Sequence, residues 1–173
     1  MKRCRVCAVE FEPARPMASV CSLKCAKRLP AINRQAAKKA TRSRQEALKP
    51  RSQWLREAQA AFNAYIRARD DHRHCISCLR HHEGQWHAGH YLSIGARPEL
   101  RFDEANCWKQ CAPCNTHLSG NLVLYRSELI RRIGRAAVEA LEGPHPPKKW
   151  TVDELRQIKA DYRLKLNLLK NKC

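Results

Sequence analysis

The sequence has few aromatic residues and few acidic ones. Phe, Trp and Tyr make up 6% of the 173 residues, which leaves little material for a large conventional hydrophobic core. Small cores usually need disulfides or metal ions to hold them together. The 16 acidic residues are outnumbered by 34 Lys and Arg residues, which gives a net charge of +18. This excess favours a polyanionic partner, with nucleic acid as the leading candidate.

Long apolar runs are missing as well. The amino-terminal residues MKRCRVC lack the apolar stretch of a signal peptide. No run approaches the ~18 apolar residues that would span a bilayer, so we expect no membrane partner. Ten cysteines in a chain without an export signal point to thiolates and metal rather than to disulfides. A disulfide-rich secreted protein is therefore disfavoured.

Eight of the ten cysteines fall into four close pairs. Two Cys-x-x-Cys pairs suit a tetrahedral zinc site, since each short pair loops around the ion and supplies two ligands. This first set is Cys75, Cys78, Cys111 and Cys114. The second set has the spacing of a small zinc knuckle and comprises Cys4, Cys7, Cys21 and Cys25. We therefore expect two structural Zn²⁺ ions, and we interpret Cys107 and Cys173 as a free buried thiol and an incidental terminal residue.

A basic segment follows the amino-terminal cysteines. Between Ala26 and Arg56 there is one acidic residue, Glu46, among many Lys and Arg residues. Residues 31–48 contain good helix formers with little apolar periodicity, which predicts either a solvated helix or a disordered arm. Charge of one sign at this density repels itself, so phosphate binding with counterion release is the favoured interpretation. The candidate DNA-binding residues here are Lys38, Lys39, Arg42 and Arg44.

Apolar residues repeat at helical spacing over Gln53–Asp70, and Ser52 can cap this helix. The stripe predicts a helix that packs on the central cysteine-rich stretch. Arg67 and Arg69 lie near its carboxyl end, where the helix dipole favours positive charge.

The carboxyl-terminal part also has helical patterns. Leu122–Ile133 and Arg135–Leu141 look helical, with Gly134 as a break between them. Thr151 and Glu154 form a capping box that opens a last helix. The apolar stripe of that helix can pack internally or against a second copy of the chain, so a homodimer stays open.

The stretch between the two Cys-x-x-Cys pairs contains groups that do chemistry. Gln85–Tyr91 suits a short strand, a loop with Gly95 and Pro98 follows, and a helix begins soon after the second pair. Strand, loop and helix around one metal-dependent site are typical of a ββα-metal finger.

In this stretch the chain resembles HNH nucleases. That family has a histidine on a strand, an asparagine in the loop and a His or Asn at the following helix, and its zinc-containing members add two flanking Cys-x-x-Cys pairs. His90, Asn106 and Asn115 occupy the three positions, in GHY, NCWKQC and CNTHLSGN. More narrowly, the chain resembles the NinG/Rap recombination proteins of lambdoid phages. YIRARD, CISC, HAGHY, LRFDEAN, QCAPCN and SGN…Y carry this resemblance, over about residues 52–134.

The resemblance implies an α+β fold: a small zinc-stabilised ββα-metal (HNH-like) finger with flanking helices and an N-terminal zinc knuckle. We expect a knuckle at 1–30, a basic helical segment at 31–73, a nuclease core at 74–122 and a helical region at 123–173. The implied function is metal-dependent endonuclease cleavage of branched double-stranded DNA, such as Holliday junctions and D-loops, in phage recombination. Other recombination proteins are then possible partners, and the location is cytoplasmic, in the host cell if a phage encodes the chain.

Phosphodiester hydrolysis assigns roles to these residues. A neutral imidazole can take a proton from the attacking water, and His90 is our choice for this base. A carbonyl acceptor from Asn106, or its backbone, would hold the imidazole in one orientation. A divalent cation, Mg²⁺ or Mn²⁺, would neutralise the phosphate, and the amide oxygen of Asn115 is a suitable ligand for it.

One departure from the HNH pattern affects the metal. These enzymes commonly carry an acidic ligand directly before the base, where this chain has Gly89. His87 projects to the same face of an extended strand as residue 89 and could replace the ligand, with His117 as a second possible donor. An imidazole ligand biases the site toward softer metals such as Mn²⁺. Arg97 and Arg101 flank the loop, where they could clamp phosphate.

Two other classes of function remain open. A non-catalytic zinc-finger DNA-binding accessory protein of recombination explains the charge and the paired cysteines, but not the spacing of the two asparagines. An RNA-binding module is a weaker alternative.

Overall fold

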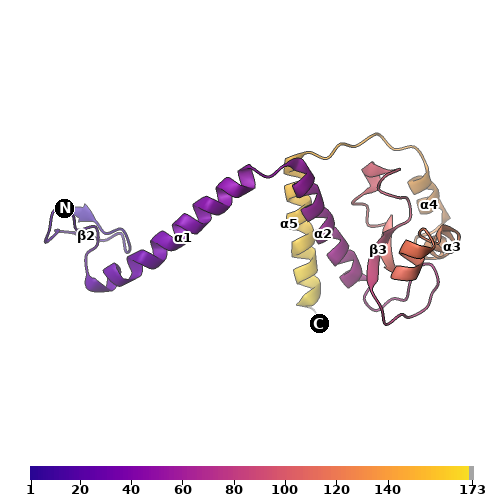
Figure 1. The fold of residues 1–173 in the computed structure, drawn as a ribbon, viewed down its shortest axis with the longest axis horizontal. Helices are drawn as coiled ribbons and strands as arrows, with labels where there is room; N and C mark the ends of the chain where they lie inside the picture. The colour runs from indigo at the N-terminus through magenta and orange to yellow at the C-terminus, as the bar shows by residue number, and fades with distance from the viewer. Residues whose placement is uncertain (172–173) are drawn as a thin grey trace. The chain divides into compact units, whose positions relative to one another are not determined.

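The structure is a computed structural model, and it describes residues 1–171. The chain forms two compact units, Met1–Lys49 and Pro50–Cys173. Helices and two small sheets make up both, so the α+β expectation is confirmed (Figure 1). Cys173, which we interpreted as incidental, lies outside the described residues. Within residues 1–171, no helix combines the length and apolar character that a membrane span requires.

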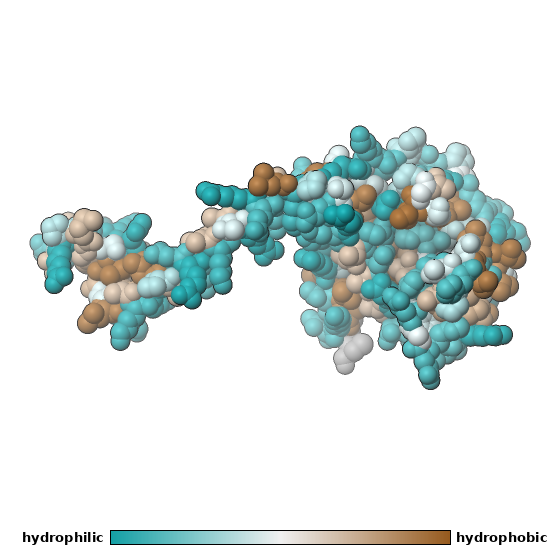
Figure 2. All heavy atoms as spheres, in the orientation of Figure 1, coloured by the Kyte–Doolittle hydropathy of each residue, from teal (hydrophilic) through white to brown (hydrophobic). Residues whose placement is uncertain are grey.

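The first unit is a small hairpin followed by one long helix. Strands β1 (Lys2–Arg3) and β2 (Glu10–Phe11) pair antiparallel. Helix α1 (Leu23–Ala47) begins at an N-cap, Ser22, whose hydroxyl accepts a hydrogen bond from the backbone N–H of Cys25. Cys25 is the one buried residue of α1, and hydrophilic residues cover most of the helix (Figure 2). Of the two alternatives that the sequence left open for this segment, a solvated helix and a disordered arm, the structure contains the helix.

The second unit is built on two helices that lie side by side, α2 (Arg51–Arg69) and α5 (Val152–Lys170) (Figure 1). Their apolar stripes form one core with part of the loop that precedes Cys107. The fully buried residues of this core are Ala58, Phe62, Ile66, Cys107 and Leu155. The stripe of α5 is thus used inside the unit, and its capping box is present as predicted.

A two-stranded antiparallel sheet lies against α2. Strand β3 (Trp86–His90) pairs with β4 (Cys107–Cys111), so that His90 lies opposite Cys107 and Gly89 opposite Trp108. The predicted strand at 85–91 is confirmed. One edge of β3 pairs with β4 and the other edge is unpaired within the described residues.

Short helical elements connect the sheet to the rest of the unit. Their bounds are η1 (Pro98–Leu100), a π-helical turn η2 (Pro113–His117), α3 (Leu122–Ile133) and α4 (Arg135–Glu142). Gly134 separates α3 from α4 with a φ of 85°, a conformation that few residues other than glycine adopt without strain.

The predicted segment boundaries differ from this division. The segment expected at 31–73 contains both α1 and α2, which belong to different units. Pro50 ends the pattern of the first helix, and it is also the N-cap of α2, so Ser52 lies inside α2 and does not cap it. The regions expected at 74–122 and 123–173 fold together, because α2 buries its stripe against both α5 and the sheet.

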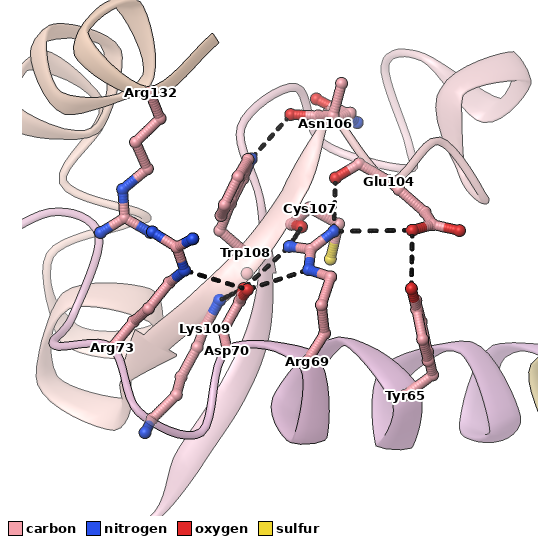
Figure 3. A network of polar contacts seen from close by, with 12 residues as sticks. Tyr65, Arg69, Asp70, Arg73, Glu104, Asn106, Cys107, Trp108, Lys109 and Arg132 are labelled. Carbon is pink, nitrogen blue, oxygen red and sulfur yellow. Dashed lines mark hydrogen bonds and ion pairs between the residues drawn. The ribbon is translucent and has the colours of Figure 1, made fainter. Parts of the chain in front are cut away.

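A buried ion pair fixes the end of α2 to β4 (Figure 3). The carboxylate of Asp70 is 1% exposed and accepts two hydrogen bonds from the guanidinium of Arg69, at 2.9 and 2.8 Å. Asp70 also accepts from the backbone N–H of Lys109 at 3.1 Å, and Arg69 donates to the carbonyl of Cys107 at 2.9 Å. The same guanidinium lies 4.4 Å over the ring of Trp108. Arg69 therefore does more than complement the helix dipole: it holds the sheet in place.

Candidate functional site

The two predicted cysteine sets each converge in space. In the set Cys75, Cys78, Cys111 and Cys114, all four sulfurs lie within 4.8 Å of one another. The Sγ atoms of Cys78 and Cys111 are 3.9 Å apart, close to the ~3.8 Å edge of a tetrahedron with Zn–S bonds of ~2.3 Å. None of the nine described cysteines forms a disulfide. The set fits a structural Zn²⁺ ion that joins the chain before β3 to the end of β4.

Backbone N–H groups favour the thiolate form of one cysteine in this set, Cys75. The N–H of Cys111 donates to Sγ of Cys75 at 3.4 Å. Burial alone would raise the pKa of the Cys75 thiol, but N–H groups of Cys111, Cys78 and Ser77 outweigh burial and lower it. His82, which the sequence suggested was a solvated turn residue, is half-buried, with Nε2 3.3 Å from Sγ of Cys78. Contacts of this kind orient metal ligands.

The amino-terminal set has the same geometry. All four sulfurs of Cys4, Cys7, Cys21 and Cys25 lie within 4.8 Å of one another. Sγ of Cys21 lies 3.5 Å from that of Cys7 and 3.8 Å from that of Cys25. This unit therefore also fits one Zn²⁺ ion.

His90 lies at the end of β3 on the face toward α2, with its ring 5.9 Å from that of Phe62. Its Nε2 is 2.9 Å from the carbonyl oxygen of Arg101, so Nε2 carries the proton and donates it. Nδ1 is then the acceptor, 3.7 Å from Sγ of Cys107. Burial lowers the pKa of His90 below its ordinary 6.5, more than the bond to the Arg101 carbonyl raises it. The imidazole is therefore neutral at neutral pH.

Asn106 does not contact His90. Its fully buried side chain donates from Nδ2 to the carbonyls of Leu92 and Leu100, at 3.0 and 3.3 Å, and accepts from the N–H of Leu92 at 2.8 Å. The acceptor that orients His90 is thus the backbone carbonyl of Arg101, and the expectation that Asn106 supplies it is wrong. Asn106 instead ties together the loop that carries this carbonyl.

His87 and Asn115 lie in direct contact. Nδ2 of Asn115, in η2, is 2.8 Å from Nδ1 of His87, on β3. The two predicted ligands of the catalytic cation are therefore neighbours. His117 is exposed at the end of η2 and lines neither of the cavities described next.

A groove follows the unpaired edge of β3, between α2 and η2. One cavity of about 540 Å³ is lined by His90 and Asn115, and a second of about 510 Å³ is lined by His87 and Asn115. The two cavities share Asn63, Ala88 and Asn115, so they are neighbours. Sequence reasoning placed both histidines and Asn115 at one site, and the groove brings all three together.

The groove offers few ligands for a hard cation. Among the described residues, no carboxylate lines either cavity. The available protein donors are an imidazole nitrogen of His87 and the amide oxygen of Asn115. Mg²⁺ usually binds through one or two carboxylates, whereas an imidazole suits a softer ion such as Mn²⁺. The donor set therefore fits Mn²⁺ better than Mg²⁺.

Gln110 explains why residue 89 is glycine. A Cβ at Gly89 would lie 2.1 Å from Oε1 of Gln110, which is fully buried on the neighbouring strand. Nε2 of Gln110 donates to Oγ of Ser77 at 2.7 Å and to the carbonyl of Gly120 at 2.6 Å, so the side chain is held there. The space that an acidic ligand would need is filled by this amide.

The predicted phosphate contacts differ in their surroundings. Arg97 donates to Glu99 at 2.5 Å and to the carbonyl of Gly143 at 2.7 Å, so its guanidinium already has partners inside the unit. Arg101 donates to Oε1 of Gln59 at 3.2 Å, and burial together with the charge of Arg51 lowers its pKa. The guanidinium of Arg101 is nevertheless charged at neutral pH, and it has no carboxylate partner among the described residues.

The four predicted basic residues of α1 are exposed: Lys38, Lys39, Arg42 and Arg44. Arg42 forms an ion pair with Glu46 at 3.3 Å.

The chain is similar to a family of phage proteins. A family model described as "NinG: Bacteriophage Lambda NinG protein" matches residues 1–172. Over 128 residues, which are 74% of its length, the chain is 56% identical to Protein ninG of Escherichia phage 933W and 53% identical to Protein ninG of Escherichia phage lambda. These matches span 64% and 63% of the length of the two relatives. No solved structure matches the chain. The chain therefore belongs to the NinG family of lambdoid phages.

Proposed function

We propose that this protein is a metal-dependent, structure-specific DNA endonuclease of the HNH type that cuts branched recombination intermediates, such as Holliday junctions and D-loops. One observation carries the proposal. A neutral imidazole, His90, and two candidate cation ligands, His87 and Asn115, line one groove beside β3, the strand that follows the first cysteine pair of the central set. The resemblance to the NinG/Rap proteins implies the branched substrates.

The residues of the groove have distinct tasks. The Nε2–H of His90 is held by the Arg101 carbonyl, so Nδ1 is the atom that takes a proton from the attacking water. Its contact with the thiol of Cys107, at 3.7 Å, is weak enough for a water to replace. His87 and Asn115 would hold the divalent cation, which when bound neutralises charge on the phosphate.

Charge supports a nucleic-acid substrate. The net charge is +18, and the predicted basic residues of α1 are open to solvent. In the second unit, Arg101 lies beside the groove with Arg51 nearby. Phosphates would find counter-charges in both units.

Substitution of His90 by glutamine tests the proposal. The variant should bind branched DNA as tightly as the wild type but cleave it about 10²- to 10⁴-fold more slowly with Mn²⁺ or Mg²⁺, because the amide cannot act as a base. The measurement is cleavage of junctions, D-loops and linear duplexes under single-turnover conditions.

His145→Gln is the matched control. His145 is half-buried, and its Nε2 makes the same kind of contact, 2.9 Å from the carbonyl of Ala140, but it lines neither cavity of the groove. Its cleavage rate should equal that of the wild type. Full activity in His90→Gln would remove His90 from the mechanism.

The pH dependence of cleavage follows from the burial of His90. A general base works only when it is neutral, so activity falls as the pH drops through its pKa. Burial lowers that pKa below 6.5, and kcat/KM should therefore stay constant down to a pH below 6.5 before it declines. An acid limb centred above the ordinary imidazole value would show that another group is the base.

A non-catalytic DNA-binding accessory protein is the second candidate. The observation in its favour is that both ring nitrogens of His90 already have neighbours, Arg101 and Cys107. Absence of metal-stimulated cleavage on every branched and linear DNA, with tight binding retained, would select this function instead.

A further inference from the structure

Helix α2 turns a polar stripe toward the groove. Gln59, Asn63 and Arg67 follow one another at intervals of four residues, and all three are half-buried. Four residues of a helix rise by about 6 Å, so the stripe runs along the groove rather than across it. The adjoining face of α2 is core, with Phe62 and Ile66 fully buried.

These three residues of α2 line three cavities that follow one another along the helix. Gln59 and Asn63 line the cavity that contains His90, and Asn63 and Arg67 line the cavity that contains His87. Arg67 also lines a third cavity of about 860 Å³. The series thus continues beyond the catalytic candidates, along α2 and toward its carboxyl end.

The hydrogen bonds of the stripe leave donors free. Arg101 donates to Oε1 of Gln59 at 3.2 Å, and Nε2 of Gln59 donates to Oδ1 of Asn63 at 2.8 Å. The side-chain oxygens are therefore used, while Nδ2 of Asn63 remains available to the groove. Within residues 1–171, the guanidinium of Arg67 has no ion pair or hydrogen bond, and it lines two cavities.

Backbone groups of β3 add to these donors. The N–H of Tyr91 donates to the carbonyl of Asn106, and this bond determines which residues of β3 point their backbone N–H and C=O groups toward β4. In an antiparallel pair such residues alternate, so the N–H and C=O of Ala88 face the unpaired edge. Free donors along a groove whose first two cavities lack carboxylates suit an anionic chain.

The third cavity has a different character. Its apolar walls come from α2, α5 and the ring of Trp86, and the residues that give them are Ala64, Ala68, Leu166, Leu169 and Trp86. Lys109 adds a cation, with Nζ 4.3 Å over the ring of Trp86, and Asp71 adds one carboxylate. Apolar and aromatic walls beside positive charge are the features with which proteins bind unpaired bases together with their phosphates.

We propose that an unpaired DNA strand binds along α2, from the cavity at His90, past Asn63 and Arg67, to the apolar cavity at Trp86. The inference rests on the proposed nuclease function for its biological purpose, and it names the substrate feature that this function reads: a single-stranded segment next to the cleaved phosphodiester. The free donors bind its phosphates, and the apolar cavity holds a base.

Two variants in a His90→Gln background test the path. Arg67→Ala removes the unpaired cation, and Asn63→Asp places a negative charge where an anion should bind. Affinity is measured by fluorescence anisotropy without divalent cations, for an oligo-dT strand and for a hairpin duplex with the same number of phosphates. Enough salt is added to screen non-specific phosphate contacts. Each variant should weaken binding of the single strand by about tenfold and of the duplex by less than about twofold.

Arg163→Ala is the matched control, because it removes the same charge from an exposed position of α5 that lines none of the three cavities. It should lower both affinities equally and slightly. Loss of strand and duplex binding to the same extent in both variants, or no loss in either, overturns the path. Zinc content and thermal unfolding establish whether each variant is folded. If Arg67→Ala does not fold, the binding data for Asn63→Asp alone decide the result.

Cleavage by the wild type is scored separately. Binding that depends on Arg67 without any cleavage would refute the nuclease and keep the strand path. Cleavage that is lost in His90→Gln, together with single-strand binding that ignores Arg67 and Asn63, would refute the path alone.

Discussion

A serine in place of Cys111 should release one of two bound zinc ions and abolish the cooperative unfolding transition of the unit that begins at Pro50. Cys111 is fully buried at the end of β4, where its set joins β4 and η2 to the chain before β3. Structural zinc contributes roughly 10–16 kcal/mol in small zinc fingers. A domain of this size has a free energy of unfolding of only about 5–15 kcal/mol. The free energy lost with the ion is therefore as large as the whole stability of the unit, and the core between α2 and α5 cannot compensate for it.

Cys25→Ser is the matched control, because Cys25 belongs to the other set, in the first unit. It should also reduce the zinc content from two equivalents to one, but it should leave the main unfolding transition in place. Zinc content measured by elemental analysis, with calorimetry on the same samples, separates the two variants. Two equivalents of zinc in Cys111→Ser, or an unchanged melting temperature, would contradict the assignment of the central set.

The elements that were predictable from the sequence are those determined by residues close together in the chain. Each Cys-x-x-Cys pair can reach one ion without any knowledge of the fold, and Thr151 caps the backbone N–H of Glu154 three residues away. Gly134 allows a positive φ by its own chemistry. These signals are local, and the structure contains each of them.

The contacts that were missed depend on the register between strands. Asn106 was a reasonable acceptor for His90 by chemistry, but a carbonyl of the intervening loop, at Arg101, is closer once β3 and β4 pair. The segment CWKQC gives no alternating pattern, because residues on both of its faces are buried, including Lys109 and Gln110. Lys109 is tolerated there because its Nζ donates to the carbonyl of Asp71 at 2.7 Å. No pattern in a single strand could show this.

The metal ligand is the clearest case of this limit. The resemblance to HNH nucleases implies an acidic ligand at the position of Gly89, and His87 was expected to compensate for its absence. The cause lies on the other strand, in a buried amide whose position depends on Ser77 and Gly120. The side-chain oxygen of Gln110 has no hydrogen-bond partner in the described structure, so the position of that amide lowers stability. The same amide also fills the space that an acidic metal ligand at residue 89 would need.

Gly89→Asp should therefore lower the free energy of unfolding by about 4 kcal/mol or more. The new Cβ would meet Oε1 of Gln110 at 2.1 Å and its Cβ and Cδ at 3.0 Å. The amide cannot swing away without breaking its bonds to Ser77 and Gly120, and a carboxylate would face an amide oxygen that offers it no donor. Chemical denaturation of the purified variant measures the loss. Gly95→Asp is the control, because a Cβ there would meet nothing within 4 Å, and its stability should stay within about 0.5 kcal/mol of the wild type.

The double variant Gly89→Asp/Gln110→Ala separates this steric cause from a general intolerance of charge at residue 89. Removing the amide clears the space, so the double variant should be more stable than Gly89→Asp alone. Gln110→Ala by itself destabilises, because it removes the donor to Oγ of Ser77 and one of the two donors to the Gly120 carbonyl. The carboxylate would then lie on the same face of β3 as His87, and cleavage should shift from a preference for Mn²⁺ toward Mg²⁺, because a hard oxygen ligand has been added. The measurements are denaturant midpoints for the four members of the cycle and cleavage rates against the concentration of each metal. Additive losses of stability would show that Gln110 is not what keeps an acid out of this position.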